Sequence, residues 1–228
     1  MTASRSILII GASRGLGLGL AGEFAAQGWA VTATVRSAAQ QAPLQALPGV
    51  RVEQLEMTDP DSLEQLAKRL SGQQFDVIFV NAGVAGPDHH STAQASAEEM
   101  GQLFLTNAVA PLRVAERLLP NLAAVHGLIV FMSSILGSIE TGAGLGMPLY
   151  GASKAALNHL AQCFVRTQDN PKLGVLLMHP GWVRTDMGGA DAPLDIDSSC
   201  KGMVRQVSAA VGQPGLRYLD FEGNALPW

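Results

Sequence analysis

Tyr150 and Lys154 stand four positions apart in a segment whose other residues are typical of a helix. Residues four apart share one face of a helix, so the phenol and the amine point the same way. A phenol titrates near pH 10, and lowering its pKa by about three units needs roughly 4 kcal/mol in favour of the phenolate. One ammonium about 4 Å away supplies roughly that amount at an effective dielectric constant of about 20. We therefore expect Lys154 to lower the pKa of Tyr150 and to make it a proton donor useful near neutral pH.

The structural alternative is a packed tyrosine beside a surface lysine, because such pairs are common on helices. Two features favour chemistry. The residues between the pair, 151–153, are small and leave room for a close ligand. The apolar segment before this helix ends in Ser133 and Ser134. We expect these serines at the carboxyl edge of a parallel sheet, where ligands bind in open α/β folds.

A glycine-rich loop, IIGASRGLGLG, follows the first apolar segment of the chain. Gly11, Gly15 and Gly17 would allow a tight turn and the close approach of a pyrophosphate, with the free N–H groups of a helix N-terminus facing it. A chance glycine-rich turn is the alternative, but the position between a strand and a helix favours a dinucleotide. The loop is not a P-loop, because no Gly-Lys-Ser/Thr follows.

Arginine stands where an NAD site would hold a carboxylate. Arg36 ends the second predicted strand, and Arg14 lies in the glycine loop. A carboxylate at the first of these positions would bind the ribose 2′-hydroxyl of NAD. Two guanidinium groups instead suit a 2′-phosphate, since each binds phosphate in a bidentate, charge-assisted way. Unless both arginines are merely exposed solubilising residues, the predicted cofactor is NADP(H).

The elements that position these residues alternate between short apolar runs and longer helical patterns. Such alternation favours βαβ units, and continuously apolar strands favour a parallel sheet that is buried on both faces. The predicted fold class is α/β, a doubly wound, mostly parallel seven-stranded sheet of the Rossmann type with helices on both faces, in a single domain over residues 1–228. Strands are expected over 6–10, 30–35, 50–57, 75–83, 127–134, 173–181 and 215–223, and helices over 18–28, 59–70, 96–122, 149–168 and 198–211.

Composition excludes several classes of partner. The net charge is −4, and Lys and Arg do not cluster, so neither nucleic acid nor an anionic membrane is expected as a partner. The two cysteines, Cys163 and Cys200, lack the spacing of a metal site, which favours a reduced cytoplasmic protein without a metal. We find no apolar run long enough for a membrane span or a signal peptide.

Four motifs in order resemble the short-chain dehydrogenase/reductase superfamily, in its compact single-domain form. GASRGLG resembles the cofactor loop of the family, NAG (81–83) its fourth-strand motif, YGASK (150–154) its catalytic motif, and HPGWVRTDM (179–187) the segment that closes on the nicotinamide. The resemblance covers nearly the whole chain. Within the superfamily, SSILGSI and the terminal EGNALPW are similar to the C-factor and sniffer-type carbonyl reductases.

The resemblance implies roles for the catalytic residues. Tyr150 would donate a proton to the substrate carbonyl oxygen, Lys154 would hold the nicotinamide ribose, and Ser134 would hydrogen-bond the carbonyl oxygen. Asn107 would steady a water linked to Lys154, although a helix residue that satisfies a backbone carbonyl is the alternative.

The serine is the least settled of these roles. The family usually places it thirteen positions before the tyrosine, and here Gly137 stands there. Ser134 is chosen because it fits the S-x-x-G spacing to Gly137, with Ser133 as the second choice and Ser138 as the third.

The resemblance also implies a set of dinucleotide contacts. Glu56 stands where an aspartate is usual, which puts the reach of its adenine contact in doubt, while Met57 could still contribute its backbone. The expected cofactor-binding residues are Gly11, Ser13, Arg14, Gly15, Leu16, Gly17, Arg36, Glu56, Met57, Asn81, Ala82, Gly83, Tyr150, Lys154, Pro180, Gly181, Val183 and Thr185.

The expected function is NADPH-dependent reduction of an aldehyde or ketone, with alcohol oxidation as the reverse reaction. The segments that would line the substrate pocket carry little charge, which favours a small apolar or neutral carbonyl or alcohol. The alternative is a cofactor-binding signalling protein of the C-factor type with little metabolic turnover. The resemblance also implies a homodimer or homotetramer.

Overall fold

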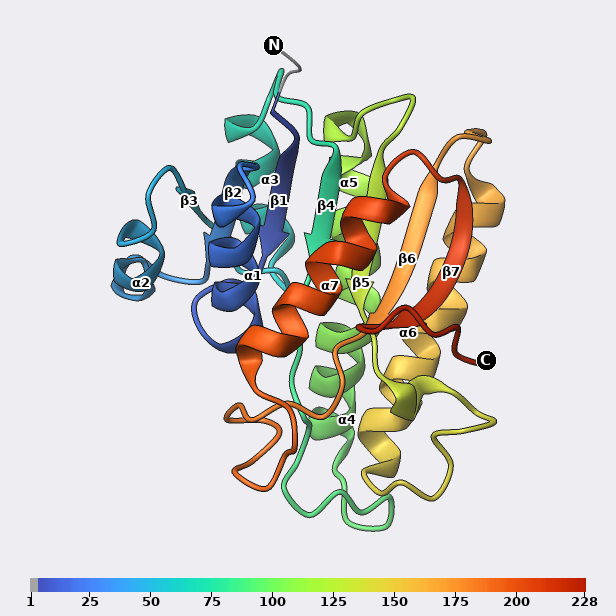
Figure 1. Cartoon of the computed structure of the whole chain (residues 1–228). Coiled ribbons are helices and arrows are strands. Elements are labelled where there is room, and N and C mark those ends of the chain that lie inside the picture. The colour runs from blue at the N-terminus through green and yellow to red at the C-terminus, as the bar shows by residue number, and fades with distance from the viewer. Residues whose placement is uncertain (1–3) are drawn as a thin grey trace.

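A fully parallel sheet forms the centre of the computed structural model, which describes residues 4–228 (Figure 1). The sheet has seven strands in the order β3-β2-β1-β4-β5-β6-β7, and each neighbouring pair runs parallel. This confirms the predicted doubly wound α/β fold. The strands are β1 (Ser6–Ile10), β2 (Ala30–Val35), β3 (Arg51–Gln54), β4 (Val77–Val80), β5 (Leu128–Met132), β6 (Gly174–His179) and β7 (Gly215–Asp220).

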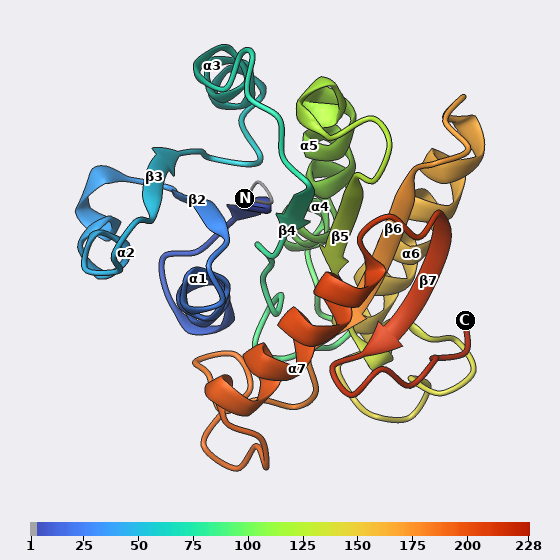
Figure 2. The same cartoon turned by 45° about the horizontal axis from the view of Figure 1, so that its top comes forward.

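Helices cover both faces of the sheet (Figure 2). One face packs against α1 (Gly15–Ala26) and α7 (Ile196–Ala210). The other face packs against α3 (Pro60–Arg69), α5 (Ala110–Leu118) and α6 (Pro148–Thr167). Two shorter helices, α2 (Ala42–Gln45) and α4 (Ala97–Phe104), complete the set of α-helices, and short 3-10 turns link several elements.

The continuous apolar runs of the strands follow from this double cover. In β5, Ile129 and Phe131 face the α3–α5–α6 side, whereas Leu128 and Val130 face the α1–α7 side. Successive side chains of a strand point to opposite faces, so a strand buried on both faces is a nearly continuous apolar run.

Local signals fix where several helices begin and end. Asp59 caps α3 by accepting a hydrogen bond from the Asp61 backbone N–H, and Pro60 occupies the first turn. Ser96 and Glu99 form a capping box at the start of α4. Gly28 follows α1 with a φ of +81°, a left-handed conformation that favours glycine.

Most predicted strands are shorter in the structure, with 50–57 reduced to Arg51–Gln54, and two predicted elements differ for identifiable reasons. The predicted strand over 75–83 ends at Val80, because the N–H groups of Asn81 and Ala82 both turn to the Ile10 carbonyl. The predicted helix over 96–122 is interrupted by a π-helical turn, Leu105–Val109, between α4 and α5. Within residues 4–228, no helix has both the length and the apolar character that crossing a membrane requires.

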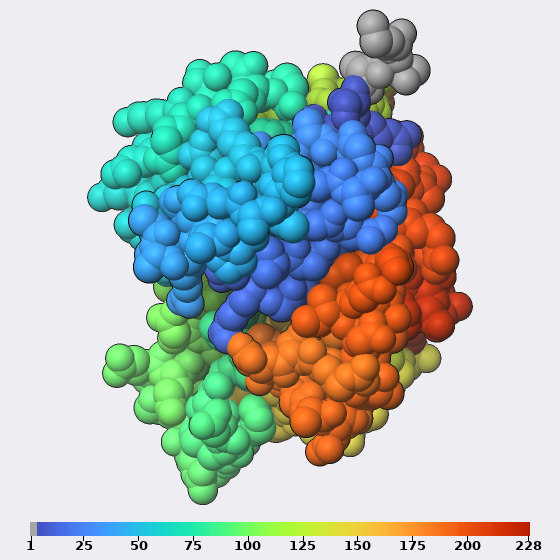
Figure 3. All heavy atoms as spheres, turned by 60° about the vertical axis from the view of Figure 1, so that its left-hand side comes forward, coloured from blue at the N-terminus to red at the C-terminus, as the bar shows by residue number. Residues whose placement is uncertain are grey.

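The carboxyl ends of the strands lie at the bottom of Figure 1, where the long loops gather. On the face shown in Figure 3, the blue region of α1, the orange segment before α7 and the green segment after β4 meet around a recess. The fold therefore brings the glycine loop and the loops after β4 and β6 to one place.

Candidate active site

Tyr150 and Lys154 lie in the first turns of α6, at the carboxyl edge of the sheet, close to the end of β5. Lys154 is only 2% exposed, and its Nζ donates a hydrogen bond to the Met132 carbonyl at 2.8 Å. The same Nζ lies 5.6 Å from the centroid of the Tyr150 ring. The structure therefore brings the phenol and the amine together, as the spacing predicts.

The pKa of Tyr150 moves opposite to the expected direction. Although the residue stays partly exposed, burial raises the pKa of Tyr150 to about 12. A hydrogen bond with the Ser134 side chain lowers this pKa, and the neighbouring Tyr218 raises it further. Burial likewise lowers the pKa of Lys154 to about 8. The predicted fall in the pKa of Tyr150 is wrong for this structure, because burial of the phenol outweighs the one contact that lowers it, with Ser134. Tyr150 is consequently protonated at neutral pH, the state that a proton donor needs.

The three candidate serines have different partners. Ser134 is the one whose side chain interacts with Tyr150, and its Oγ also accepts a hydrogen bond from the Leu136 N–H at 3.2 Å. Ser133 Oγ donates to the Asn158 side chain at 2.6 Å. Ser138 Oγ accepts from the Thr141 N–H at 3.0 Å and lies 3.4 Å from the Trp228 carbonyl oxygen.

Gly137, at the usual family position of the serine, packs directly on α6. A Cβ added to Gly137 would lie 2.9 Å from both the carbonyl carbon and the Cβ of Lys154. A serine at this position would therefore collide with the helix that carries Tyr150 and Lys154, so position 137 does not accommodate the serine in this structure.

Asn107 is fully buried in the π-helical turn and fixes the segment after β4. Its Oδ1 accepts a hydrogen bond from the Val84 N–H at 2.9 Å, and its Nδ2 donates to the Val84 carbonyl at 2.8 Å and to Ser153 Oγ at 3.0 Å. The side chain thus holds an adjacent segment by its backbone, and the expected water contact stays a prediction.

A sequence signal for the π-helical turn is present at Pro111. Proline has no N–H, so Pro111 is unable to donate the α-helical hydrogen bond to the carbonyl of Asn107, four residues earlier. Turns of the π type often mark functional sites. The sequence reasoning missed this proline, which could have located the break in the helix at Asn107.

The glycine loop is packed so tightly that side chains are excluded. Gly11 has a φ of +86°, and a Cβ there would lie 2.6 Å from the Cβ of Ala82. A Cβ on Gly17 would lie 2.1 Å from the Gly11 carbonyl oxygen. Asn81 secures the same oxygen through a hydrogen bond from Nδ2 of 2.6 Å. Ser13, Gly15 and Leu16 complete the loop and the first residues of α1.

The start of α1 is open to an anion. Arg14 occupies the N-cap position, and no side chain among residues 4–228 caps this helix end. Its first N–H groups and its partial positive charge are therefore available to a phosphate. Thr34, which the sequence reasoning missed, holds the loop in place: its Oγ1 accepts from the Gly11 N–H at 3.0 Å, and its carbonyl accepts from the Ala12 N–H at 2.8 Å.

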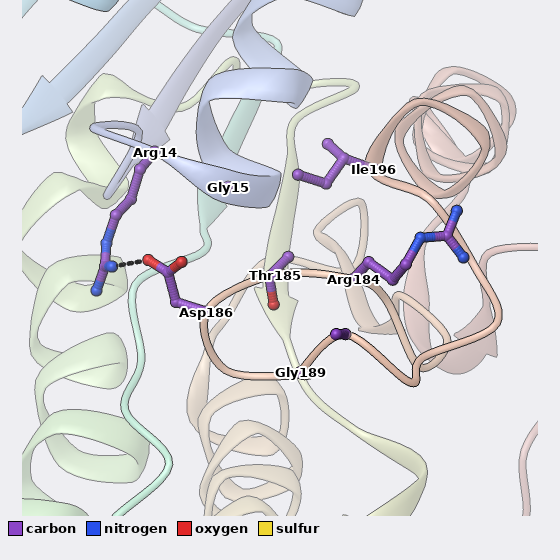
Figure 4. Close-up of a pocket in the computed structure, with 8 residues that line it drawn as sticks. Arg14, Gly15, Arg184, Thr185, Asp186, Gly189 and Ile196 are labelled. Carbon is purple, nitrogen blue, oxygen red and sulfur yellow. Dashed lines mark hydrogen bonds and ion pairs between the residues drawn. The ribbon is translucent and has the colours of Figure 1, made fainter.

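A cavity of about 580 Å³ lies between this helix end and the loop after β6 (Figure 4). Arg14 reaches across its mouth and forms an ion pair with Asp186. The cavity is lined by Arg14, Gly15, Arg184, Thr185, Asp186, Gly189, Ala190 and Ile196.

Three further residues are expected to contact the adenine half of the cofactor. Only one of them has a side chain that is free to bind a ligand. Arg36 is exposed at the end of β2 and free to meet a ligand. The Glu56 carboxylate accepts hydrogen bonds from the N–H and the hydroxyl of Thr58, at 3.1 and 2.8 Å. These bonds stabilise the local turn and occupy the carboxylate. Met57 is 6% exposed and packs in the core.

The segment after β6 is built as a braced loop. Gly181 has a φ of +83°, and the Pro180 carbonyl accepts a hydrogen bond from Ser199 Oγ at 2.6 Å. Thr185 Oγ1 accepts from the Gly188 N–H at 3.1 Å, and Val183 is buried. The sequence reasoning missed the bracing group, Arg184, which donates to the carbonyls of residues 192 and 193 at 2.9 and 2.8 Å.

Gly83 joins the two halves of the site. A Cβ on Gly83 would lie 3.2 Å from Asn107 Oδ1 and 3.4 Å from Lys154 Nζ, while the preceding Ala82 contacts Gly11. The glycine loop and the Tyr150–Lys154 pair are therefore linked through residues 82 and 83.

Residues 4–228 contain no group of His, Cys, Asp and Glu side chains that could hold a metal ion. The arrangement suits a dinucleotide beside a proton donor.

Comparison with known families agrees with this arrangement. A sequence model of the family described as short chain dehydrogenase matches residues 5–193. Among curated proteins, the C-signal protein of Myxococcus xanthus is 36% identical over 155 residues, which span 67% of this chain and 92% of that protein.

Solved structures extend the likeness over the whole fold. A protein from Burkholderia multivorans, assigned as a short-chain dehydrogenase/reductase and solved with bound NADP, is 42% identical with a TM-score of 0.95, covering 99% of this chain and 100% of its own. A carbonyl reductase from Pseudomonas aeruginosa PAO1 in complex with NADP is 40% identical with a TM-score of 0.90, again covering 99% and 100%.

Proposed function

The chain belongs to the short-chain dehydrogenase family, and from this premise we propose that it is an NADP(H)-dependent carbonyl reductase. The reaction moves a hydride between the nicotinamide and the carbonyl or alcohol carbon of a small apolar or neutral substrate. The observation that carries the proposal is the meeting of Ser134, Tyr150 and Lys154 at the carboxyl edge of the sheet.

The residues present fit a dinucleotide. The close packing of Gly11 and Gly17 leaves a cradle without side chains at the open N-terminus of α1, and the cavity next to it holds about 580 Å³. When bound there, NADPH supplies the hydride. The N–H groups at the start of α1 would bind the pyrophosphate, and Thr185, which lines the cavity, would contact the nicotinamide.

The chain's own residues handle the proton. Tyr150, protonated at neutral pH, donates its phenolic proton to the carbonyl oxygen as that oxygen gains charge. Ser134, beside Tyr150, hydrogen-bonds the same oxygen and holds it in place. Lys154 has a pKa of about 8 and is therefore mostly protonated near pH 7, where it binds the nicotinamide ribose and stabilises a developing phenolate.

The choice of NADP(H) over NAD(H) rests on Arg14 and Arg36 together with the absence of a carboxylate at the end of β2, a segment the structure describes fully. Two solved relatives carry NADP, which supports the same choice.

We expect Arg36→Leu to weaken NADPH binding about tenfold or more, because a charge-assisted phosphate contact is lost. NADH binding should stay within about twofold of wild type, since NADH has no 2′-phosphate. Titration of both cofactors by fluorescence checks this, and equal losses for both would contradict the assignment.

The likeness to the C-signal protein favours one second candidate, a cofactor-binding signalling protein with little turnover. The presence of all of Ser134, Tyr150 and Lys154 at one site favours the enzyme. A homodimer or homotetramer in the cytoplasm is part of the proposal for either function.

The test is NADPH consumption with a panel of aldehydes and ketones, for wild type and Tyr150→Phe. We expect at least one substrate to be reduced by wild type, and a loss of about 10²- to 10⁴-fold in Tyr150→Phe, the usual contribution of a general acid. NADPH binding should persist in the variant. Equal rates for the two proteins would overturn the mechanism, and the absence of any turnover by a wild type that binds NADPH would favour the signalling candidate.

A further inference from the structure

A buried polar cluster lies behind Ser134, on the face of the sheet that α6 covers. Tyr218, on β7, is only 3% exposed, and its hydroxyl donates a hydrogen bond to the main-chain carbonyl of Ser134. Ser133 and Asn158 hydrogen-bond to each other at 2.6 Å, and both side chains also contact the Tyr218 phenol. These contacts tie the end of β5 to β7 and α6 at the point where Ser134 leaves the sheet.

Ser134 therefore connects the two tyrosines of the chain. Its main-chain carbonyl accepts from Tyr218, while its side chain interacts with Tyr150. Its backbone is extended, with φ −158° and ψ 149°, and a 3-10 turn follows at once. The direction of the Ser134 Cα–Cβ bond, from which its hydroxyl extends, consequently depends on how the backbone at this residue is held.

The segment after β7 holds Tyr218 in turn. The ring of Tyr218 packs against Trp228 with 5.6 Å between centroids, and the Leu226 N–H donates to the Tyr218 carbonyl at 2.9 Å. The Trp228 carbonyl accepts from the Glu140 N–H at 3.2 Å. Figures 1 and 2 both show this terminal segment beside the yellow loop that follows β5.

We propose that Tyr218 is a positioning residue: its hydroxyl fixes the peptide group of Ser134 and thereby aims the Ser134 side chain at Tyr150 and at the substrate carbonyl oxygen. The inference rests on the proposed function, in which Ser134 polarises that oxygen. It extends the active site to β7 and to the segment after it, which contribute no residue to the Ser–Tyr–Lys set.

The first test is the steady-state kinetics of Tyr218→Phe, which keeps the ring that packs against Trp228 and removes only the hydroxyl. We expect kcat and kcat/KM for carbonyl reduction to fall together by about tenfold, because a small displacement of Ser134 weakens a contact needed in the transition state. The dissociation constant of NADPH should change by less than about twofold, since the cofactor loop is untouched. Unchanged kcat would overturn the proposal.

A matched control is Thr167→Val, at the far end of α6. It also removes a hydroxyl that bonds a main-chain carbonyl, in this case that of Phe164 at 3.0 Å. The control should retain wild-type kcat, and thermal unfolding of both variants shows that they fold. A tenfold loss of kcat in the control as well would identify the effect of Tyr218→Phe as general loosening and overturn the proposal.

A double-mutant cycle separates positioning from a merely structural role. If Tyr218 acts through the Ser134 side chain, adding Tyr218→Phe to Ser134→Ala should change kcat by less than about twofold. A further tenfold loss on that background would show that Tyr218 acts by another route.

Crystal structures of wild type and Tyr218→Phe give a readout that needs no substrate. We expect the Ser134 side chain to contact the Tyr150 hydroxyl in wild type and to have moved away in the variant. An unmoved Ser134 side chain would overturn the inference even if the enzyme is active. Failure of wild type to reduce any carbonyl would instead contradict the proposed function, and the two structures would still decide the role of Tyr218.

Discussion

Burial of charge opposes ionisation of both Tyr150 and Lys154, although Lys154 is fully buried and Tyr150 stays partly exposed. Burial raises the pKa of the phenol to about 12 and lowers that of the amine to about 8. Each shift favours the uncharged form. In the proposed reaction the phenol would therefore begin neutral, and Lys154 would stabilise the charge that develops on it.

Replacement of Lys154 should reveal how much the buried ammonium destabilises the folded protein. We expect Lys154→Met to raise the thermal midpoint at pH 7 by a few degrees, because a buried ammonium with one hydrogen bond is exchanged for an apolar side chain of similar length. The folded protein releases this proton at about pH 8 and the unfolded chain near 10.5, so the advantage should be full below pH 8 and shrink between pH 8 and 10.5.

The measurement is a series of thermal unfolding curves of wild type and Lys154→Met from pH 7 to 10. Lys154→Gln serves as the polar control of similar size. Turnover should be lost in both variants. A lower midpoint for Lys154→Met at pH 7 would show that the ammonium stabilises the fold rather than burdens it.

At the scale of elements, close approaches decide where glycine is required. Gly17→Ala should destabilise the protein by about 1–3 kcal/mol, because its Cβ would lie 2.1 Å from the Gly11 carbonyl oxygen and 2.8 Å from the Ala12 Cα, both backbone atoms. We also expect NADPH binding to be lost, since the loop must shift. Chemical denaturation and NADPH titration are the two measurements.

Gly101→Ala, within α4, is the matched control. Its added Cβ meets nothing within 4 Å, so it should stabilise the protein by about 0.5–1 kcal/mol through the higher helix propensity of alanine. If Gly17→Ala bound NADPH as well as wild type, the glycine loop would not be the cofactor cradle.

The order and type of the long elements followed from the sequence, because strands buried on both faces read as apolar runs and helices carry caps such as Asp59 and Ser96. Helix α2 and the π-helical turn did not. Helix α2 has only four residues, too few for a period, and the π-helical turn depends on a missing N–H at Pro111.

The gathering of the site residues followed from the topology, since strand ends meet at one edge. The direction of the Tyr150 pKa did not, because the ion-pair argument left out the burial of the phenol. Arg184 braces its own loop, and Tyr218 contacts Ser134 from a distant part of the chain. Neither contact has a sequence pattern from which it could be predicted.

At the scale of the whole molecule, exposed apolar side chains gather at the carboxyl end of the sheet. Among residues 4–228, only Val125 of the large exposed apolar residues precedes a strand. The others lie on segments that follow β4, β5, β6 or β7, the end of the sheet where the candidate site lies. They are Val84, Met100, Ile139, Leu145, Trp182, Met187 and Trp228.

Apolar substrates should therefore be preferred. Across a series of straight-chain aldehydes, we expect kcat/KM to rise by about two- to fourfold per added methylene until the surface is covered, as burial of apolar area predicts. Aldehydes of equal length that end in a carboxylate should react at least about tenfold more slowly, because these exposed apolar side chains offer no cation to a carboxylate that they cover. A flat series, or a preference for the carboxylates, would contradict this reading of the surface.

The most direct measurement of the central claim is the fate of a labelled hydride. Wild type is incubated with NADPH deuterated at both C4 positions of the nicotinamide and with an aldehyde that it reduces, and the alcohol is analysed by mass spectrometry. The account predicts one deuterium on the carbinol carbon, and essentially no labelled alcohol with Tyr150→Phe. Alcohol without deuterium, or labelled alcohol formed equally well by the variant, would contradict it.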